Sequence, residues 1–262
     1  MRKGQPIGVF DSGVGGTSIW KEIHRFLPME HTIYLADSLN APYGEKSREE
    51  IINLSFKNTS KLLEFGAKII VVACNTATTN AIRELRSNFK VPFIGIEPAI
   101  KPAMLKSQTK TIGILATKGT LSSALFAETA DLYSQQAKII EVEGKGLVKA
   151  IEGGRMDTFE MEMLLRDLLH PMLQENIDYL VLGCSHYPYL IPKLKKILPE
   201  GVTIIDSGRA VAKQTKAVLE GLGLLAVSPQ KAPEFYTNSD PEVLKSLVNL
   251  PQETFKVTFL DF

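Results

Sequence analysis

The chain has two cysteines, Cys74 and Cys184, and each directly follows a short apolar run. These runs, Ile69–Ala73 and Tyr179–Gly183, predict buried strands, so each thiol is expected at the end of a strand, where ligands bind in open α/β sheets. A thiol has a reference pKa of about 8.5, which helix N-termini and polar neighbours readily lower toward neutrality. A thiolate and a thiol on opposite walls of one site would form the base and acid that inversion of a carbon centre requires.

Three other roles for the two thiols stay open from the residues alone. A disulfide would be unusual in a reducing cytoplasm. A zinc site made by Cys74, Cys184 and His186 would need a further ligand or water, and Cys-x-His is not a usual zinc spacing. Inert thiols in a core are the commonest fate of cysteine. The polar residues that follow each cysteine at once favour a functional site over an inert one.

Small polar residues gather where predicted strands lead into helices. The first strand runs into Asp11–Thr17, which is glycine-rich but matches neither the phosphate-binding loop nor the dinucleotide fingerprint. Asn75 and Thr76 follow the first cysteine, and Ala116–Thr120 ends another strand with hydroxyl groups. Each turn alone could be a plain turn or a helix cap. Their convergence at one edge favours a site for a small anionic ligand.

Composition limits the class of protein. The 262 residues allow one large domain or two smaller ones, and contents of 44% hydrophobic and 23% charged residues are typical of a soluble globular protein. A formal net charge of +1 gives no sign of a nucleic-acid-binding surface. No apolar run approaches the roughly 20 residues that span a bilayer, and the N-terminus lacks the apolar core of a signal peptide. We expect a cytoplasmic protein with reduced thiols and no membrane or nucleic-acid partner.

Short apolar runs alternate with longer amphipathic ones, which predicts an α/β fold with parallel strands. The first series of predicted strands is Ile7–Phe10, Thr32–Ala36, Ile69–Ala73 and Phe93–Ile96, with helices at Thr17–Phe26, Arg48–Glu64 and Ala77–Ser87. The second series of strands is Thr111–Ala116, Lys138–Glu143, Tyr179–Gly183 and Val202–Ile205, with helices at residues 121–134, 145–151, 157–175 and 191–198.

The two series resemble each other. Ile7–Phe10 matches Ile112–Leu115, and Cys74 matches Cys184 after a similar spacing. This predicts an internal duplication, although such matches also occur by chance in α/β proteins. A duplication would give two similar parallel-sheet domains related by a pseudo-two-fold axis, with the cysteines on opposite walls of the cleft between them.

The last part of the chain is not needed to complete either series. It holds a predicted helix at Ala210–Leu222, a connector at residues 227–233, Phe235-Tyr236-Thr237, a helix beginning near Pro241, and Val257–Leu260. We expect it to pack back on the first half. The predicted domains are therefore residues 1–97 with 207–262, and residues 98–206.

The motifs of the chain are similar to those of a known family. The chain resembles glutamate racemase of the aspartate/glutamate racemase family over essentially its whole length. The resemblance rests on Phe10–Gly16, Pro42-Tyr43-Gly44, Ala73–Ala77, Ala116–Thr120, Gly183–Pro188 and Phe235-Tyr236-Thr237. The family usually has threonine after the second cysteine, where this chain has Ser185, so the hydroxyl is kept.

The resemblance implies cofactor-independent interconversion of L- and D-glutamate, without a metal, in a protein that commonly forms homodimers. It implies that Cys74 handles the proton on the D-glutamate side and Cys184 the proton on the L side, assisted by Asp11, His186 and Glu152. Its implied substrate-binding residues are Asp11, Ser12, Pro42, Tyr43, Gly44, Asn75, Thr76, Thr117, Thr120, Ser185 and His186. The implied role is supply of D-glutamate for bacterial peptidoglycan.

Other interpretations stay open. Asp11 could simply cap the first helix, His186 could be a structural histidine, and Glu152 could be a surface helix end. An aspartate racemase or another amino-acid racemase is possible, although those usually carry an acidic residue at the His186 position. A non-catalytic binding protein for a small acid could use the same cleft, but it would not need paired thiols.

Overall fold

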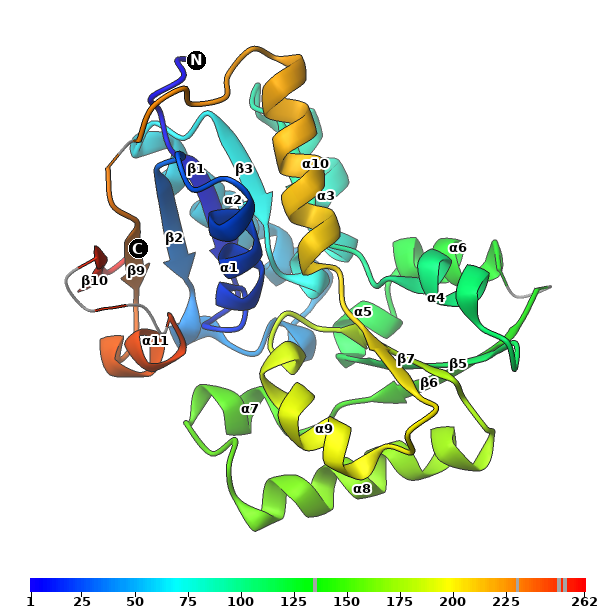
Figure 1. Cartoon of the computed structure of the whole chain (residues 1–262). Coiled ribbons are helices and arrows are strands. Elements are labelled where there is room, and N and C mark those ends of the chain that lie inside the picture. The colour runs from blue at the N-terminus through cyan, green and yellow to red at the C-terminus, as the bar shows by residue number, and fades with distance from the viewer. Residues whose placement is uncertain (134–135, 230, 249–250, 252–253) are drawn as a thin grey trace.

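The computed structural model describes residues 1–133, 136–229, 231–248, 251 and 254–262. These residues form two parallel β-sheets, each with helices against it, and the two sheets lie in separate parts of the molecule (Figure 1). The predicted α/β class with two parallel-sheet domains is therefore confirmed.

The first sheet has the strand order β10-β9-β2-β1-β3-β4. Its strands are β1 (Ile7–Asp11), β2 (Thr32–Ala36), β3 (Ile69–Val72), β4 (Phe93–Gly95), β9 (Glu234–Thr237) and β10 (Lys256–Phe259). Its helices are α1 (Thr17–Phe26), α2 (Arg48–Glu64), α3 (Asn75–Asn88), α10 (Gly208–Gly221) and α11 (Pro241–Val248).

The second sheet has the strand order β6-β5-β7-β8. Its strands are β5 (Thr111–Ala116), β6 (Lys138–Glu143), β7 (Tyr179–Gly183) and β8 (Thr203–Ile205). The helices of this part are α4 (Ile100–Lys106), α5 (Lys118–Leu121), α6 (Ala124–Asp131), α7 (Leu147–Glu152), α8 (Phe159–Gln174) and α9 (Ile191–Ile197).

The two sheets repeat one layout. In each, the first strand in the chain lies between the second and the third, and the fourth pairs with the third. Cys74 directly follows β3 and Cys184 directly follows β7, so each thiol lies at the carboxyl end of the third strand of its sheet. The shared order agrees with the predicted duplication and puts the cysteines at matching positions.

Burial on both faces explains why the strands appear in the sequence as continuous apolar runs. Val9 and Val71 pack in one core with α1, α10 and α11, whereas Phe10 and Val72 pack in another with α2 and α3. The strand β6 is an exception, because it lies at an edge of its sheet and alternates exposed and half-buried residues.

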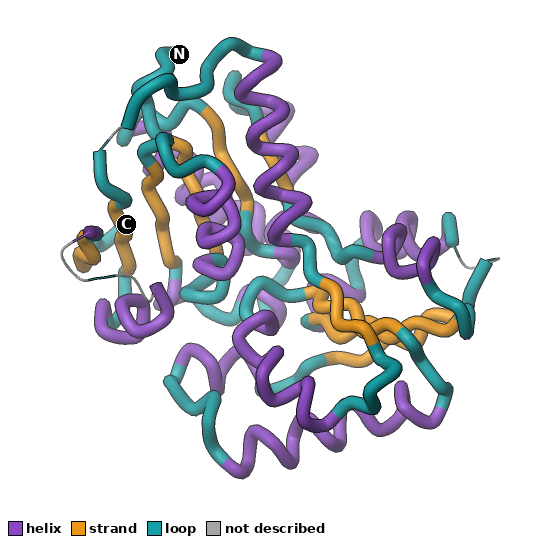
Figure 2. The backbone as a smooth tube through the Cα atoms, in the orientation of Figure 1, coloured by secondary structure: helices purple, strands orange, loops and turns teal. Residues whose placement is uncertain are grey.

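The C-terminal segment joins the first sheet. Strand β9 pairs in parallel with β2, and β10 pairs with β9, so the chain returns to the sheet where it began (Figure 2). The exact division at residues 97/98 and 206/207 stays a prediction. None of the helices in the described part of the chain is long and apolar enough to cross a membrane.

Some predicted elements differ from the structure. The helix predicted at residues 121–134 begins later, as α6 at Ala124, because Ser123 caps it by accepting a hydrogen bond from the Phe126 amide. The short helix α5, which ends at Leu121, was not predicted. Residue 134 lies outside the described residues, as does residue 230 of the predicted connector. Helix α4 was not predicted, because its seven residues include Pro102 and form too short a pattern to recognise.

Candidate active site

A cavity of about 240 Å³ lies where the carboxyl ends of both sheets meet, and both cysteines line it. The structure thus brings residues from the two halves of the chain into one site. The lining residues are Ser12, Pro42, Tyr43, Gly44, Cys74, Asn75, Thr76, Thr117, Val148, Cys184, Ser185 and His186. Of the predicted site residues, Asp11, Thr120 and Glu152 lie behind this lining and contact it by hydrogen bonds.

Cys74 caps helix α3. Its sulfur accepts a hydrogen bond from the Ala77 amide at 3.4 Å, and its thiol donates to the Ser12 hydroxyl at 3.5 Å. Burial and the nearby charge of Asp11 raise the pKa of Cys74 above the usual range. Both cysteines are free, so the disulfide alternative is wrong for this structure. Cys74 is therefore held as a neutral thiol, which can donate a proton.

Cys184 has a different partner. Its sulfur lies 3.7 Å from Nδ1 of His186, whose Nε2 lies 2.5 Å from Oε1 of Glu152. Burial alone would lower the pKa of His186, but the hydrogen bonds to Cys184 and Glu152 and their charges outweigh it and raise this pKa well above its usual value. A protonated imidazole can donate to the sulfur and to the carboxylate at once. The imidazole of His186 is thus the hydrogen-bond partner of the Cys184 sulfur.

Glu152, at the end of α7, connects the two halves of the chain. Its Oε1 accepts a hydrogen bond from the Val14 amide at 2.7 Å, and its Oε2 accepts one from the Ser38 hydroxyl at 3.0 Å. Both donors belong to the first half, whereas His186 belongs to the second. Glu152 is therefore not a free helix end, and it fixes the His186 ring against the glycine-rich turn.

Asp11 is fully buried behind the cavity. One oxygen accepts hydrogen bonds from the Gly16 amide at 2.9 Å and the Gly13 amide at 3.3 Å, and the other accepts from the Ser185 hydroxyl at 3.1 Å. Burial raises the pKa of this carboxyl group. Asp11 does bond the backbone at the start of α1, as the capping interpretation expected, but it also reaches the opposite wall.

A group of three threonines joins the walls on another side. The Thr76 hydroxyl lies 2.8 Å from that of Thr117 and 3.3 Å from that of Thr120, and the last two are 3.0 Å apart. Their hydroxyl hydrogens can turn toward one another or toward a ligand. These threonines form a polar wall suited to a carboxylate.

Asn75 is the polar residue of the lining that lacks a partner. Its side chain is 2% exposed, yet neither its amide nitrogen nor its amide oxygen has a hydrogen bond within the described part of the chain. A buried amide without partners costs about 1–3 kcal/mol. Such a group in a cavity wall indicates a ligand that would satisfy it.

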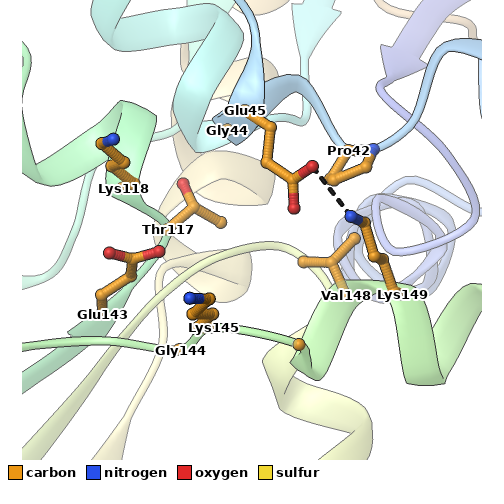
Figure 3. A pocket seen from close by; sticks show the side chains of 11 residues that line it. Pro42, Gly44, Glu45, Thr117, Lys118, Glu143, Gly144, Lys145, Val148 and Lys149 are labelled. Carbon is orange, nitrogen blue, oxygen red and sulfur yellow. Dashed lines mark hydrogen bonds and ion pairs between the residues drawn. The ribbon is translucent and has the colours of Figure 1, made fainter.

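A second pocket, of about 350 Å³, adjoins the cavity and shares Pro42, Gly44, Thr117 and Val148 with it. Figure 3 shows the Lys118, Lys145 and Lys149 side chains around this pocket, with Glu143 and Glu45 among them. Lys149, on α7, pairs with Glu45 of the first half at 2.8 Å. The outer pocket has a mixed charge with three cations, which suits the approach of an acidic molecule.

Comparison with known proteins agrees with the site. Residues 7–215 match the family model described as Asp/Glu/Hydantoin racemase. The chain belongs to this racemase family. It is 43% identical to a glutamate racemase of Ectopseudomonas mendocina over 246 residues, which covers 94% of each protein.

Solved racemases of the family have the same fold. A glutamate racemase isoform of Bacillus anthracis superposes with a TM-score of 0.88 at 32% identity, covering 99% of this chain and 98% of that one. The Escherichia coli glutamate racemase, solved with L-glutamate and the activator UDP-MurNAc-ala, gives 0.86 at 32% identity and covers 97% of each chain. The resemblance to the family found in the sequence is confirmed.

Several residues of this racemase-family site were not predicted. Val148 lines the cavity, the amide of Val14 and the hydroxyl of Ser38 hold Glu152, and Tyr189 bonds Thr17 across the halves at 2.6 Å. The contacts of Val14, Ser38 and Tyr189 could not be predicted, because each joins residues more than 100 positions apart in the chain. No group of three or more His, Cys, Asp or Glu side chains among the described residues is arranged to hold a metal ion.

The close approach of the glycine-rich turn to His186 gives a testable prediction. A Cβ atom added at Gly15 would overlap the His186 ring. Gly15→Ala should therefore displace the ring or the turn and lower kcat/KM at least about tenfold, since a displacement of about 1 Å can cost roughly a hundredfold. Gly201→Ala is the control, because nothing lies within 4 Å of its added Cβ. Equal activity of the two variants would contradict the prediction.

Proposed function

We propose that this protein interconverts L-glutamate and D-glutamate by proton transfer at the α-carbon, with Cys74 and Cys184 as the two acid–base groups and without a cofactor. The relatives named glutamate racemase, at about 43% identity over most of the chain, support the substrate. The observation that carries the proposal is that one cavity is lined by both cysteines and by the unpartnered Asn75 amide.

Proton transfer between the two walls would proceed as follows. The Cys184 thiolate removes the α-proton of L-glutamate and becomes a thiol, and the electron pair stays on the α-carbon. The Cys74 thiol then gives its proton to the opposite face, which leaves a Cys74 thiolate and D-glutamate. The reverse reaction uses the same groups in the opposite roles, so each turnover exchanges their protonation states.

Preorganised polar groups must stabilise the charge that develops at the α-carbon, because its proton is very weakly acidic. The hydroxyl groups of Ser12, Thr76, Thr117 and Ser185 and the Asn75 amide can supply these dipoles around the carboxylates. Asp11 and Thr120 act from behind this layer through Ser185 and Thr76. His186 and Glu152 tune the Cys184 side, and the wall formed by Pro42, Tyr43 and Gly44 completes the binding site.

The biological setting belongs to the same proposal. D-glutamate produced in the cytoplasm of a bacterium would supply peptidoglycan synthesis and thereby cell shape. A homodimer is the proposed assembly, on the basis of the family resemblance.

The direct test is the optical signal of L-glutamate, followed by circular dichroism with purified protein and no added cofactor. The expected result is decay of the signal to zero as the enantiomers equilibrate. L-aspartate is measured in parallel, and its signal is expected to persist. A constant glutamate signal, in the presence of a binding isotherm for glutamate, would instead favour the non-catalytic binding protein.

Asn75 provides a test of the ligand-binding wall. Asn75→Ala should raise the KM for glutamate about tenfold or more, because a hydrogen bond to a charged group contributes about 1.5–3 kcal/mol. The urea midpoint should be unchanged or higher than that of the wild-type protein. The substitution removes an unpaired buried amide, and alanine has a higher helix propensity than asparagine. Asn88→Ala in the same helix is the control, because the Asn88 amide bonds the Glu84 carbonyl far from the cavity. A stable variant with unchanged KM would show that Asn75 does not contact the substrate.

A further inference from the structure

We propose that Asn238, in the C-terminal segment, is a positioning residue for the racemisation proposed above: it holds the segment 37–45, which forms one wall of the cavity and also carries the hydroxyl that fixes Glu152. The inference rests on the proposed function. Neither Asn238 nor its partners were singled out in the sequence.

The contacts of Asn238 are short and buried. The residue follows β9, and its side chain is 5% exposed. Its amide nitrogen donates to Oδ1 of Asp37 at 2.6 Å, and its amide oxygen accepts a hydrogen bond from the Leu39 amide at 2.9 Å. Both ends of one side chain are thus used to hold the turn that follows β2.

Asp37 passes this restraint to the cavity wall. It is fully buried, and its Oδ2 accepts a hydrogen bond from the Tyr43 hydroxyl, which in turn accepts one from the Asn58 amide at 3.0 Å. Tyr43 and Gly44 both line the cavity. The carboxylate of Asp37 therefore fixes the wall from behind, without touching the cavity itself.

The same segment reaches the other side of the site. Ser38 lies between the two residues that Asn238 holds, and its hydroxyl donates to Oε2 of Glu152 at 3.0 Å. Glu152 contacts His186, which contacts Cys184. The Asn238 amide thus restrains the cavity wall at Tyr43 and Gly44. It also restrains Ser38, whose hydroxyl holds the Glu152 carboxylate beside His186.

In the contact between Asp37 and Asn238 only Asp37 can carry a charge, which makes the pairing specific. Asp37 receives hydrogen bonds from Asn238, Asn40 at 2.7 Å and Tyr43, with Lys57 at 3.8 Å as its nearest cation. An amide at position 238 can donate to this carboxylate, whereas a carboxylate there would face it with like charge. Buried like charges in contact are strongly unfavourable.

The experiment compares Asn238→Ala and Asn238→Asp with Thr237→Val in the full-length protein. Thr237 is fully buried at the end of β9, and in the described structure its hydroxyl accepts a hydrogen bond only from the nearby Ser239 amide. Thr237→Val therefore removes a buried hydrogen bond next to Asn238 without removing a contact to residues 37–45. Asn238→Ala is expected to raise the KM for both enantiomers about tenfold at a temperature where it is fully folded. Thr237→Val is expected to leave the KM within twofold of the wild-type value, even if its melting temperature falls as much as that of Asn238→Ala.

A reversed pair separates positioning from simple stabilisation. Asn238→Asp should impair activity at least as much as Asn238→Ala. Combining it with Asp37→Asn restores one donor and one acceptor across the contact and should recover kcat/KM several-fold over Asn238→Asp alone. A KM for Asn238→Ala within twofold of that of the unchanged protein would overturn the inference. So would a double variant no better than Asn238→Asp, if both are folded.

These measurements distinguish an error in the proposed function from an error in the proposed role of Asn238. If the unchanged protein does not racemise glutamate, the proposed function is wrong. If it racemises glutamate and folded Asn238→Ala has a KM within twofold of it, the proposed function stands and the positioning role of Asn238 is wrong.

Discussion

Replacing either Cys74 or Cys184 by alanine is expected to lower kcat/KM for glutamate racemisation by about a thousandfold or more, within the range that acid–base groups contribute. Each direction needs one group to remove a proton and the other to supply one. Losing one thiol therefore disables both directions rather than one. The two enantiomers have the same free energy, so kcat/KM must fall equally from either side, and an unequal loss would reveal a faulty assay.

The measurement is the decay of the circular dichroism signal from pure L-glutamate and from pure D-glutamate. Far-ultraviolet spectra and melting temperatures of the variants control for loss of fold. In heavy water the unchanged protein should place deuterium in the product enantiomer before it appears in the remaining substrate, because the donating thiol has exchanged with solvent. Full activity in either folded variant would contradict a two-thiol mechanism.

Removing the support of Cys184 is expected to have the next largest effect. His186→Asn should lower kcat/KM about a hundredfold, because the sulfur loses the imidazole that lies 3.7 Å from it. Glu152→Gln should have a smaller effect, since the amide oxygen can still accept a hydrogen bond from the Val14 amide and the amide nitrogen can donate one to the Ser38 hydroxyl. Activity of His186→Asn within threefold of the unchanged protein would favour the purely structural role for this histidine.

The raised pKa of His186 determines how the free energy of unfolding changes with pH. The pKa of His186 is raised in the folded protein, so its protonated form stabilises the fold below its unfolded pKa of about 6.5, and this contribution is lost as the pH rises through the folded pKa. Glu152→Gln removes a hydrogen bond and a charge that raise this pKa. The loss of stability, followed by urea denaturation from neutral to alkaline pH, begins near the unfolded pKa in both proteins and should be smaller and end at lower pH in Glu152→Gln. An unchanged profile would mean that Glu152 does not hold the imidazolium.

The sequence was informative where one pattern determines one structure. Burial on both faces leaves a continuous apolar run, which is why β2, β5 and β7 begin and end at the predicted residues. Where the local signal is weak the predictions were less accurate. Cys74 itself caps α3, so that helix begins at Asn75 and not at Ala77, as predicted. Gly146, with a φ of 86°, delays the start of α7 until Leu147.

The residue types that form the site could be predicted from the sequence, but most of the contacts between these residues could not. Ser12 and Asn75 were expected to meet because parallel strands of one sheet share a carboxyl edge. Ser185 was expected to face them because the predicted duplication placed the two halves across one cleft. The roles of Ser38 and Asn238 could not be predicted. Both depend on how a turn after β2 meets segments 114 and 201 positions further along the chain. Such long-range pairings have no periodicity for a sequence pattern to reveal.

The repeated strand order has a stereochemical consequence. If two copies of one ancestral half paired about a two-fold axis, each would present the same thiol to the shared cavity, from opposite sides. A tetrahedral carbon bound on that axis would meet one sulfur on each face, which is the arrangement that mirror-image substrates require. In this chain the cysteines occupy matching positions after β3 and β7, and the sulfurs have unlike neighbours, Ser12 for one and His186 for the other. Matching positions with unlike neighbours suit a pair of substrates that differ only in the face that carries the proton.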